Sequence, residues 1–219
     1  MQLFFLVAFL GVSLMFGGQA SADPVAAGDI VQLRLTATNG STITRFSNGG
    51  PFRMDLPGTA SDFLTFCLEA DEYFTPGENL LVGAIATSAQ DGGVNTNSGD
   101  PISGTTAFLY SRFRAGDTSY GNGALLQEAI WFLEGERTTR GAAAAGLIAQ
   151  AQMDMSAIGW GVDYLGNVRV ANLYRGANYA TFAQDMLVTT SVPEPATLLL
   201  MGLGLLIGTR GRKRRATVR

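Results

Sequence analysis

The sequence contains no histidine among its 219 residues. Histidine is the usual general base near neutral pH and the commonest protein ligand of transition metals. Its absence excludes Ser-His-Asp and Cys-His nucleophile systems. Paired carboxylates such as Glu134 and Glu136 are a poor substitute, because residues two apart on a helix point to different faces. We therefore predict that the protein is not an enzyme and binds no metal or cofactor.

Lysine and cysteine are also scarce. No lysine precedes Lys213, and Cys67 is the only cysteine. A single cysteine cannot form a disulfide within its own chain, so Cys67 is a free thiol, an intermolecular bridge or a group with another use. Its plainest interpretation is a small buried apolar side chain. A domain without lysine has no side-chain amine to attack an electrophile of its own, although a GC-rich genome explains the same absence.

The N-terminal segment has the pattern of a secretory signal peptide. Residues 3–16 are almost wholly apolar, and Ala20-Ser21-Ala22 forms a small-residue cleavage site ahead of Asp23. The only departure is that no lysine or arginine precedes the apolar run. We expect residues 1–22 to be removed and residues 23–190 to form one exported domain.

Positive charge is rare in the predicted domain. Residues 23–190 hold 17 acidic and 9 basic residues, a net charge of −8. An acidic domain without a basic patch argues against nucleic acid as a partner and against docking on anionic lipid.

The C-terminal tail has three parts in a fixed order. A stiff, extended Val192-Pro193-Glu194-Pro195 segment comes first, and the uncharged residues 196–209 follow. The tail then carries a basic cluster, made of Arg210, Arg212, Lys213, Arg214 and Arg215. The apolar run is shorter than the ~20 residues that span a bilayer alone, and the basic cluster favours the cytoplasmic side of a membrane.

This tail, residues 191–215, resembles the PEP-CTERM sorting signal, whose proteins are substrates of the membrane enzyme exosortase. The resemblance implies a Gram-negative bacterium that makes exopolysaccharide. It also implies export, a transient anchor in the inner membrane through the C-terminal helix, and processing near the Pro-Glu-Pro motif. The product would then reach the cell surface or the extracellular matrix. The alternative is an ordinary C-terminal membrane tail.

Strand patterns precede helix patterns in the predicted domain. Short alternating or apolar runs predict strands at residues 30–38, 41–46, 51–56, 63–69 and 80–87, with closing strands at 167–173 and 185–190. Residues 90–101 are polar and predict a surface loop. Helical spacing appears at residues 105–113, 124–134 and 141–153. This order predicts an α+β domain, a β-sandwich or barrel with a helical insertion.

Two segments of the predicted domain, taken together, suggest a reaction between their side chains. They are Thr65-Phe66-Cys67-Leu68-Glu69 and Leu126-Gln127-Glu128-Ala129-Ile130-Trp131. They resemble the two halves of the thioester domains of bacterial surface adhesins, in which a strand cysteine is joined to a helix glutamine. The resemblance implies a bond between Cys67 and Gln127, with Ile130 and Trp131 completing the helical motif. It departs from the family pattern at Leu126, where a polar residue is common.

The physical chemistry of such a bond is coherent. A thiolate is a good nucleophile and leaving group, and proximity offsets the low reactivity of an amide. Phe66, Trp131 and Phe132 are candidates for an apolar wall that excludes water. An amine-bearing ligand would then attack the Gln127 carbonyl carbon.

An alternative to the thioester stays open. Cys67 and Gln127 are also typical of an ordinary core, with a buried, hydrogen-bonded amide. In that case the domain is a non-covalent structural or carbohydrate-binding matrix protein. The candidates for aromatic side chains that stack on a ligand are then Tyr110, Tyr120, Trp160, Tyr164 and Tyr174.

Overall fold

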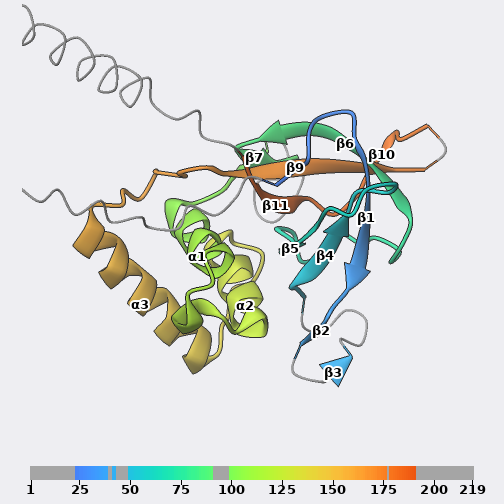
Figure 1. Ribbon diagram of the computed structural model, residues 1–219. Coiled ribbons are helices and arrows are strands. Elements are labelled where there is room, and N and C mark those ends of the chain that lie inside the picture. The colour runs from blue at the N-terminus through green and yellow to red at the C-terminus, as the bar shows by residue number, and fades with distance from the viewer. Residues whose placement is uncertain (1–22, 39–40, 43–48, 91–98, 177, 191–219) are drawn as a thin grey trace, which may run out of the picture.

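A computed structural model describes residues 23–38, 41–42, 49–90, 99–176 and 178–190. These residues form a sheet with three helices at one side (Figure 1). The helices follow one another between β8 and β9, so they are an insertion between strands, as predicted. The α+β class is confirmed.

The main sheet has seven strands, and every pairing within it is antiparallel. Its order is β10-β9-β6-β1-β4-β5, and β11 also pairs with β9. The strands are β1 (Ile30–Leu35), β4 (Phe52–Asp55), β5 (Asp62–Thr65), β6 (Asn79–Ala86), β9 (Val168–Arg175), β10 (Thr181–Phe182) and β11 (Met186–Thr189). Two short hairpins are added: β2 (Ala37–Thr38) with β3 (Ser41–Thr42), and β7 (Ser88–Ala89) with β8 (Asp100–Pro101).

The sheet is not closed into a barrel, so that part of the prediction is wrong. β11 is paired along its full length with β9. It meets the chain after β5 only at an isolated bridge between Cys67 and Met186. The described strands include no second large sheet to complete a sandwich. Closure would need a continuous ladder between β5 and β11, whereas Cys67 and Met186 form a single bridge there.

The helices begin at identifiable caps. Ser103 caps α1 (Gly104–Arg114) by accepting from the Thr106 N–H, and Asn122 caps α2 (Gly123–Leu133) by accepting from the Leu125 N–H. Helix α3 (Ala142–Ile158) ends at Gly159, whose φ of 70° lies in the left-handed region that favours glycine at a helix C-terminus. The short 3-10 helix η2 (Thr118–Tyr120) joins α1 to α2. No helix among the described residues is long and apolar enough to cross a membrane.

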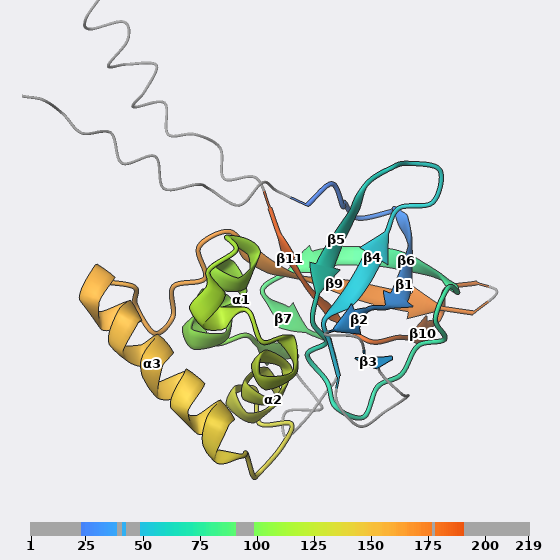
Figure 2. The same ribbon diagram turned by 60° about the horizontal axis from the view of Figure 1, so that its bottom comes forward.

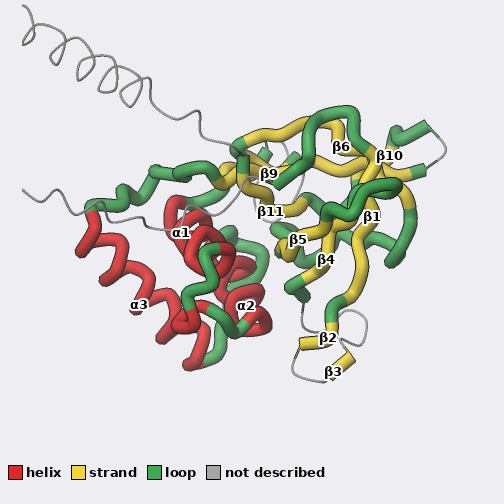
Figure 3. Tube along the Cα trace, in the orientation of Figure 1, coloured by secondary structure: helices red, strands yellow, loops and turns green. Residues whose placement is uncertain are grey.

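The core has two parts that meet at the segment after β5. One lies between the helices and the start of β9, and includes Phe66. The other covers the sheet and includes Cys67 together with Trp131 from α2. Figure 3 shows the helices gathered beside the sheet rather than across its face. The segment after β5 therefore lies at the boundary between the helical part and the sheet.

The two ends of the described domain are joined. The Asp23 N–H donates to the Thr189 carbonyl oxygen at 2.8 Å. The Asp23 carboxylate accepts from the Thr189 N–H at 2.6 Å and pairs with Arg114 Nη1, also at 2.6 Å. Figure 2 shows the start of the described chain close to the end of β11. The predicted signal peptide, residues 1–22, and the predicted sorting helix lie outside the described residues.

Candidate functional site

The structure brings Cys67 and Gln127 into contact. Cys67 lies two residues after β5, and Gln127 is in the second turn of α2. The Cys67 thiol donates to Gln127 Oε1 with a sulfur–oxygen distance of 3.2 Å. Cys67 is 3% exposed and Gln127 is fully buried. Sixty positions apart in the chain, the two side chains form one buried unit between the sheet and α2.

The Gln127 amide occupies the open end of the β4–β5 ladder. The last pair in this ladder is Phe52 with Thr65, and continuing the register would place Gly50 opposite Cys67. Instead, the N–H groups of Gly50 and Cys67 both donate to Gln127 Oε1, at 2.9 and 3.2 Å. Gln127 Nε2 donates to the Cys67 carbonyl oxygen at 2.8 Å. A side-chain amide from α2 thus takes the place of the next peptide group, which explains why β5 ends at Thr65.

The turn before β4 is pressed against Gln127. A Cβ atom at Gly49 would lie 2.1 Å from Gln127 Cγ, and one at Gly50 would lie 3.0 Å from Gln127 Oε1. Gly49 also has a φ of 61°, which disfavours other residues. On the far side of the turn, a Cβ at Gly123 would lie 2.3 Å from Pro51 Cδ. The sequence thus has glycine on both sides of the contact between this turn and α2.

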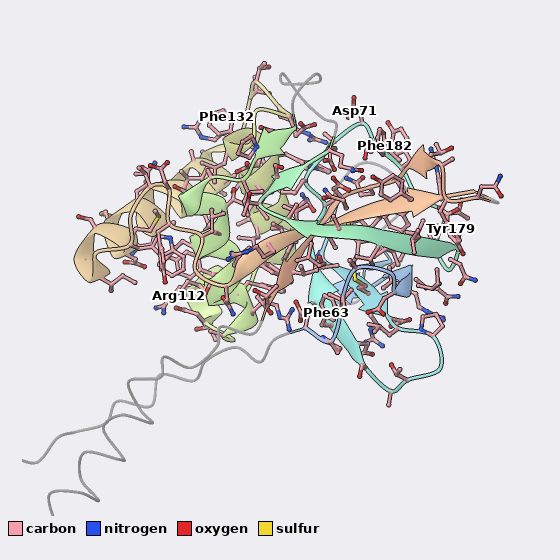
Figure 4. The ribbon with its side chains drawn as sticks, turned by 90° about the horizontal axis from the view of Figure 1, so that it is seen from above. Phe63, Asp71, Arg112, Phe132, Tyr179 and Phe182 are labelled. Atoms are coloured by element: carbon pink, nitrogen blue, oxygen red, sulfur yellow. The ribbon has the colours of Figure 1, made fainter. Side chains whose placement is uncertain are left out.

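The predicted wall around the site is only partly present. Phe66 is fully buried and packs edge-on against Tyr110 and Phe113. Trp131 is 5% exposed and belongs to the same core cluster as Cys67. Ile130 is buried in the cluster on the helical side. Phe132 has a different place, on the helical side of the molecule with its ring 3.8 Å from the Arg140 guanidinium (Figure 4).

A cavity of about 540 Å³ reaches Cys67. Apolar and aromatic groups line most of it, among them Phe52, Phe74 and Trp131. Gly49, Glu72 and Tyr73 also line it, and Tyr73 is 51% exposed. A cavity of this size accommodates a small ligand or a side chain of another protein. It gives the buried thiol a route to molecules outside.

The electrostatic surroundings keep the thiol protonated. Burial raises the pKa of the Cys67 thiol, and the nearby Glu69 carboxyl adds to this effect. Burial also raises the pKa of Glu69, with a further contribution from Asp185. Glu69 Oε2 accepts from Gln184 Nε2 and from the Asp185 N–H. A neutral thiol is the form that donates to Gln127 Oε1, and it resists oxidation better than a thiolate.

The paired carboxylates have structural partners. Glu134 Oε1 accepts from the hydroxyls of Ser103 and Thr106 at the start of α1. Glu136 Oε2 accepts from the Ala70 N–H, three residues after Cys67. Both side chains tie the end of α2 to neighbouring elements.

The candidate stacking aromatics are mixed in exposure. Tyr110 and Tyr120 are buried in the core. Trp160 is half-buried, and its ring packs edge-on against Tyr164, which is 57% exposed. Tyr174 is also half-buried and packs against Phe182. Buried rings cannot stack on a ligand, so Tyr110 and Tyr120 are not platforms.

Sequence reasoning missed the backbone donors of Gly50 and Cys67. The predicted elements gave no role to Gly49 and Gly50, which precede the predicted strand at 51–56. A signal for their role lies in the register, because strands at 51–56 and 63–69 that pair antiparallel bring the start of one close to the end of the other. No sequence pattern, however, places a helix glutamine between them.

Comparison with known proteins identifies one segment. Residues 191–215 match the PEP-CTERM protein-sorting motif, so the chain carries this sorting signal at its C-terminus. The motif implies export and processing by exosortase. No curated protein and no solved structure gave a match. The motif lies outside the described residues.

Proposed function

We propose that this is a cell-surface or matrix protein whose domain attaches covalently to amine-bearing ligands through a Cys67–Gln127 thioester. The observation that carries the proposal is the buried contact between Cys67 Sγ and Gln127 Oε1 at 3.2 Å. Contact alone also fits an ordinary core. The additional support is that the partners are the residue types a thioester needs and that a cavity reaches Cys67.

The geometry supports a route by which the proposed bond would form. Cys67 Sγ attacks Gln127 Cδ, and the thiol proton passes to the departing amide nitrogen. The Cδ–Nε2 bond breaks, ammonia leaves, and a carbon–sulfur bond remains. Holding both groups in one buried site supplies the proximity that makes an amide reactive. Low exposure of both residues limits attack by water on the product.

Attachment uses the same carbon. A primary amine that enters the cavity attacks Gln127 Cδ, the carbon–sulfur bond breaks, and the thiol regains a proton from the amine. The product is an amide crosslink with a free Cys67 thiol. Residues 23–190 contain no lysine, so no side-chain amine of the domain competes with the ligand.

Delivery to the surface follows from the tail. The proposal takes residues 1–22 as the signal peptide and residues 196–209 as a temporary inner-membrane anchor. The basic residues Arg210–Arg215 then lie on the cytoplasmic side, and exosortase processing near Pro193-Glu194-Pro195 releases the domain. A covalent attachment device is useful for a protein that has to remain outside the cell.

A second candidate function is non-covalent ligand binding in the same cavity. The aromatic lining favours it, since Phe74 and Trp131 offer apolar faces and Tyr73 lies partly exposed at the opening. Trp131 Nε1 is buried without a hydrogen-bond partner among the described residues, which leaves a donor for a ligand. In this case Cys67 and Gln127 only join the sheet to α2.

Intact mass separates the two candidates. The purified exported protein is compared with Cys67→Ala, before and after incubation with methylamine. A thioester makes the wild-type chain one ammonia lighter than its sequence. Methylamine then adds its own mass, which leaves the chain one CH₂ heavier than its sequence, whereas Cys67→Ala shows neither change. A wild-type mass equal to the sequence, with Cys67 titrating as a free thiol, would leave only non-covalent binding.

A further inference from the structure

Three donors converge on one buried oxygen. Gln127 Oε1 accepts from the Gly50 N–H at 2.9 Å, from the Cys67 N–H at 3.2 Å and from the Cys67 thiol at 3.2 Å. The orientation of the amide is fixed by its other end, because Nε2 donates to the Cys67 carbonyl oxygen at 2.8 Å. Reversing the amide would place its NH₂ group against two N–H donors. The oxygen therefore faces the backbone donors.

These two donors lie just beyond the end of the β4–β5 ladder. They belong to residues on neighbouring strand ends, which the β4–β5 register would otherwise place opposite each other. Backbone N–H groups that are already oriented toward an oxygen need no rearrangement when negative charge develops there. Burial strengthens their effect, because the site excludes water.

We propose that the Gly50 and Cys67 N–H groups form an oxyanion hole for Gln127, positioned by the turn 49–51. This inference rests on the proposed thioester. When Cys67 Sγ adds to Gln127 Cδ, the carbonyl electron pair moves to Oε1 and both N–H groups stabilise the charge. The charge returns to the carbonyl as ammonia leaves with the thiol proton. Attack by an amine on the thioester passes through the same oxyanion, so one hole serves both steps.

The turn supplies the close approach that the hole needs. Gly49 and Gly50 have no side chains, which lets the backbone come within hydrogen-bonding distance of Oε1. A methyl group at Gly49 would lie 2.1 Å from Gln127 Cγ, and one at Gly50 would lie 2.9 Å from Phe66 Cδ1. Either substitution must separate the turn from the side chains that it contacts, chiefly Gln127 at Gly49 and Phe66 at Gly50, while the identities of Cys67 and Gln127 are unchanged. Gly49 and Gly50 are positioning residues in this account.

The test measures how fast methylamine opens the thioester in Gly49→Ala and Gly50→Ala. The full chain is exported, purified and followed by intact mass. Loss of one donor predicts a rate constant about 10²-fold lower than wild type. The matched control is Gly58→Ala. Gly58 also has a positive φ, of 83°, but a Cβ there has no neighbour within 4 Å, so its methylamine rate should equal that of wild type.

A spectroscopic measurement separates positioning from general damage. With ¹³C in the side-chain carbonyl of glutamine, the thioester carbonyl gives an isotope-shifted infrared band. Strong hydrogen bonds lower its frequency, so the band should move up in both turn variants and stay unchanged in Gly58→Ala. Near-ultraviolet circular dichroism checks that each variant is folded, and Gly50→Ala serves if Gly49→Ala does not fold.

The outcomes are distinct. Slow reaction with a shifted band supports the oxyanion hole. A wild-type thioester whose rate and band are unchanged in the folded turn variants would refute the hole and leave the proposed function intact. A wild-type chain that never loses ammonia would refute both.

Discussion

Replacing Asp23 by alanine should destabilise the domain far more than its place at the start of the domain suggests. The Asp23 side chain is 1% exposed, and Oδ1 lies 2.6 Å from Arg114 Nη1. Oδ2 accepts from both the N–H and the hydroxyl of Thr189, at 2.6 and 3.1 Å. The change removes one partner of a buried ion pair and two hydrogen bonds to β11.

The expected loss in the free energy of unfolding follows from the burial of this ion pair. Breaking a buried ion pair by removing one partner costs about 3–5 kcal/mol. Arg114 retains a hydrogen bond to the Tyr110 hydroxyl at 3.0 Å, so its charge keeps a polar neighbour. We therefore expect the lower end of the range, about 3 kcal/mol. A urea m-value of ~1–3 kcal/mol/M converts this to a midpoint about 1–3 M lower.

The assay is urea unfolding at pH 7, followed by circular dichroism. Asp62→Ala is the matched control, since Asp62 pairs with Arg53 at 3.2 Å but both side chains are about half exposed. That pair should contribute less than about 1 kcal/mol. Equal losses for the two variants would show that Asp23 is not buried against Arg114 in solution. A double-mutant cycle with Arg114→Met should give a favourable coupling energy for the buried pair.

Three further predictions concern pH, the cavity and the tail. Burial raises the pKa of the Glu69 carboxyl above its ordinary value of 4.5. The contribution of this carboxyl to the free energy of unfolding is therefore complete below pH 4.5 and is lost as the pH rises. Glu69→Gln should therefore unfold at higher urea than wild type at pH 8, with a smaller difference at pH 4.5; a constant difference would contradict the shift. Trp131→Leu should admit water and speed hydrolysis of the thioester, which is measured as a mass gain of one water over time. The control Trp160→Leu should not change the hydrolysis rate. Equal hydrolysis rates in the two variants would argue against Trp131 as a barrier to water. In a host with exosortase, replacing Pro193, Glu194 and Pro195 by alanine should leave the tail attached, so that the mature variant is heavier than the mature wild type. Equal mature masses would exclude processing at this motif.

Sequence patterns located the elements whose apolar residues have a clear period. The 124–134 pattern corresponds to α2, residues 123–133, and the 80–87 pattern to β6, residues 79–86. The predicted 63–69 strand is shorter than expected because the Gln127 amide replaces its next ladder partner after Thr65. Strands β7, β8 and β10 were missed, since each has two residues and too little length to show alternation.

The candidate site was predicted better in its residues than in its surroundings. Cys67 and Gln127 were paired from sequence, and the structure places them in contact. The walls were less predictable, because Phe132 and Trp131 are adjacent in the helix and face different neighbours. The backbone donor at Gly50 depends on strand register and helix docking together, and no local pattern in the sequence encodes that combination.

The two ends of the described domain lie together, next to the start of the sorting signal. The sorting signal begins at residue 191, two residues after Thr189, and Thr189 is hydrogen-bonded to Asp23. Strand β1 lies across β6 from β9 and begins level with the Tyr174 end of β9, whereas Thr189 pairs at the Val168 end. Leu35, at the end of β1, lines the cavity. The start and the end of residues 23–190 therefore share one pole of the domain, where β11 ends at Thr189. Cys67 pairs with Met186 at the other end of β11, so the thiol lies one short strand away from the residue that leads into the sorting signal.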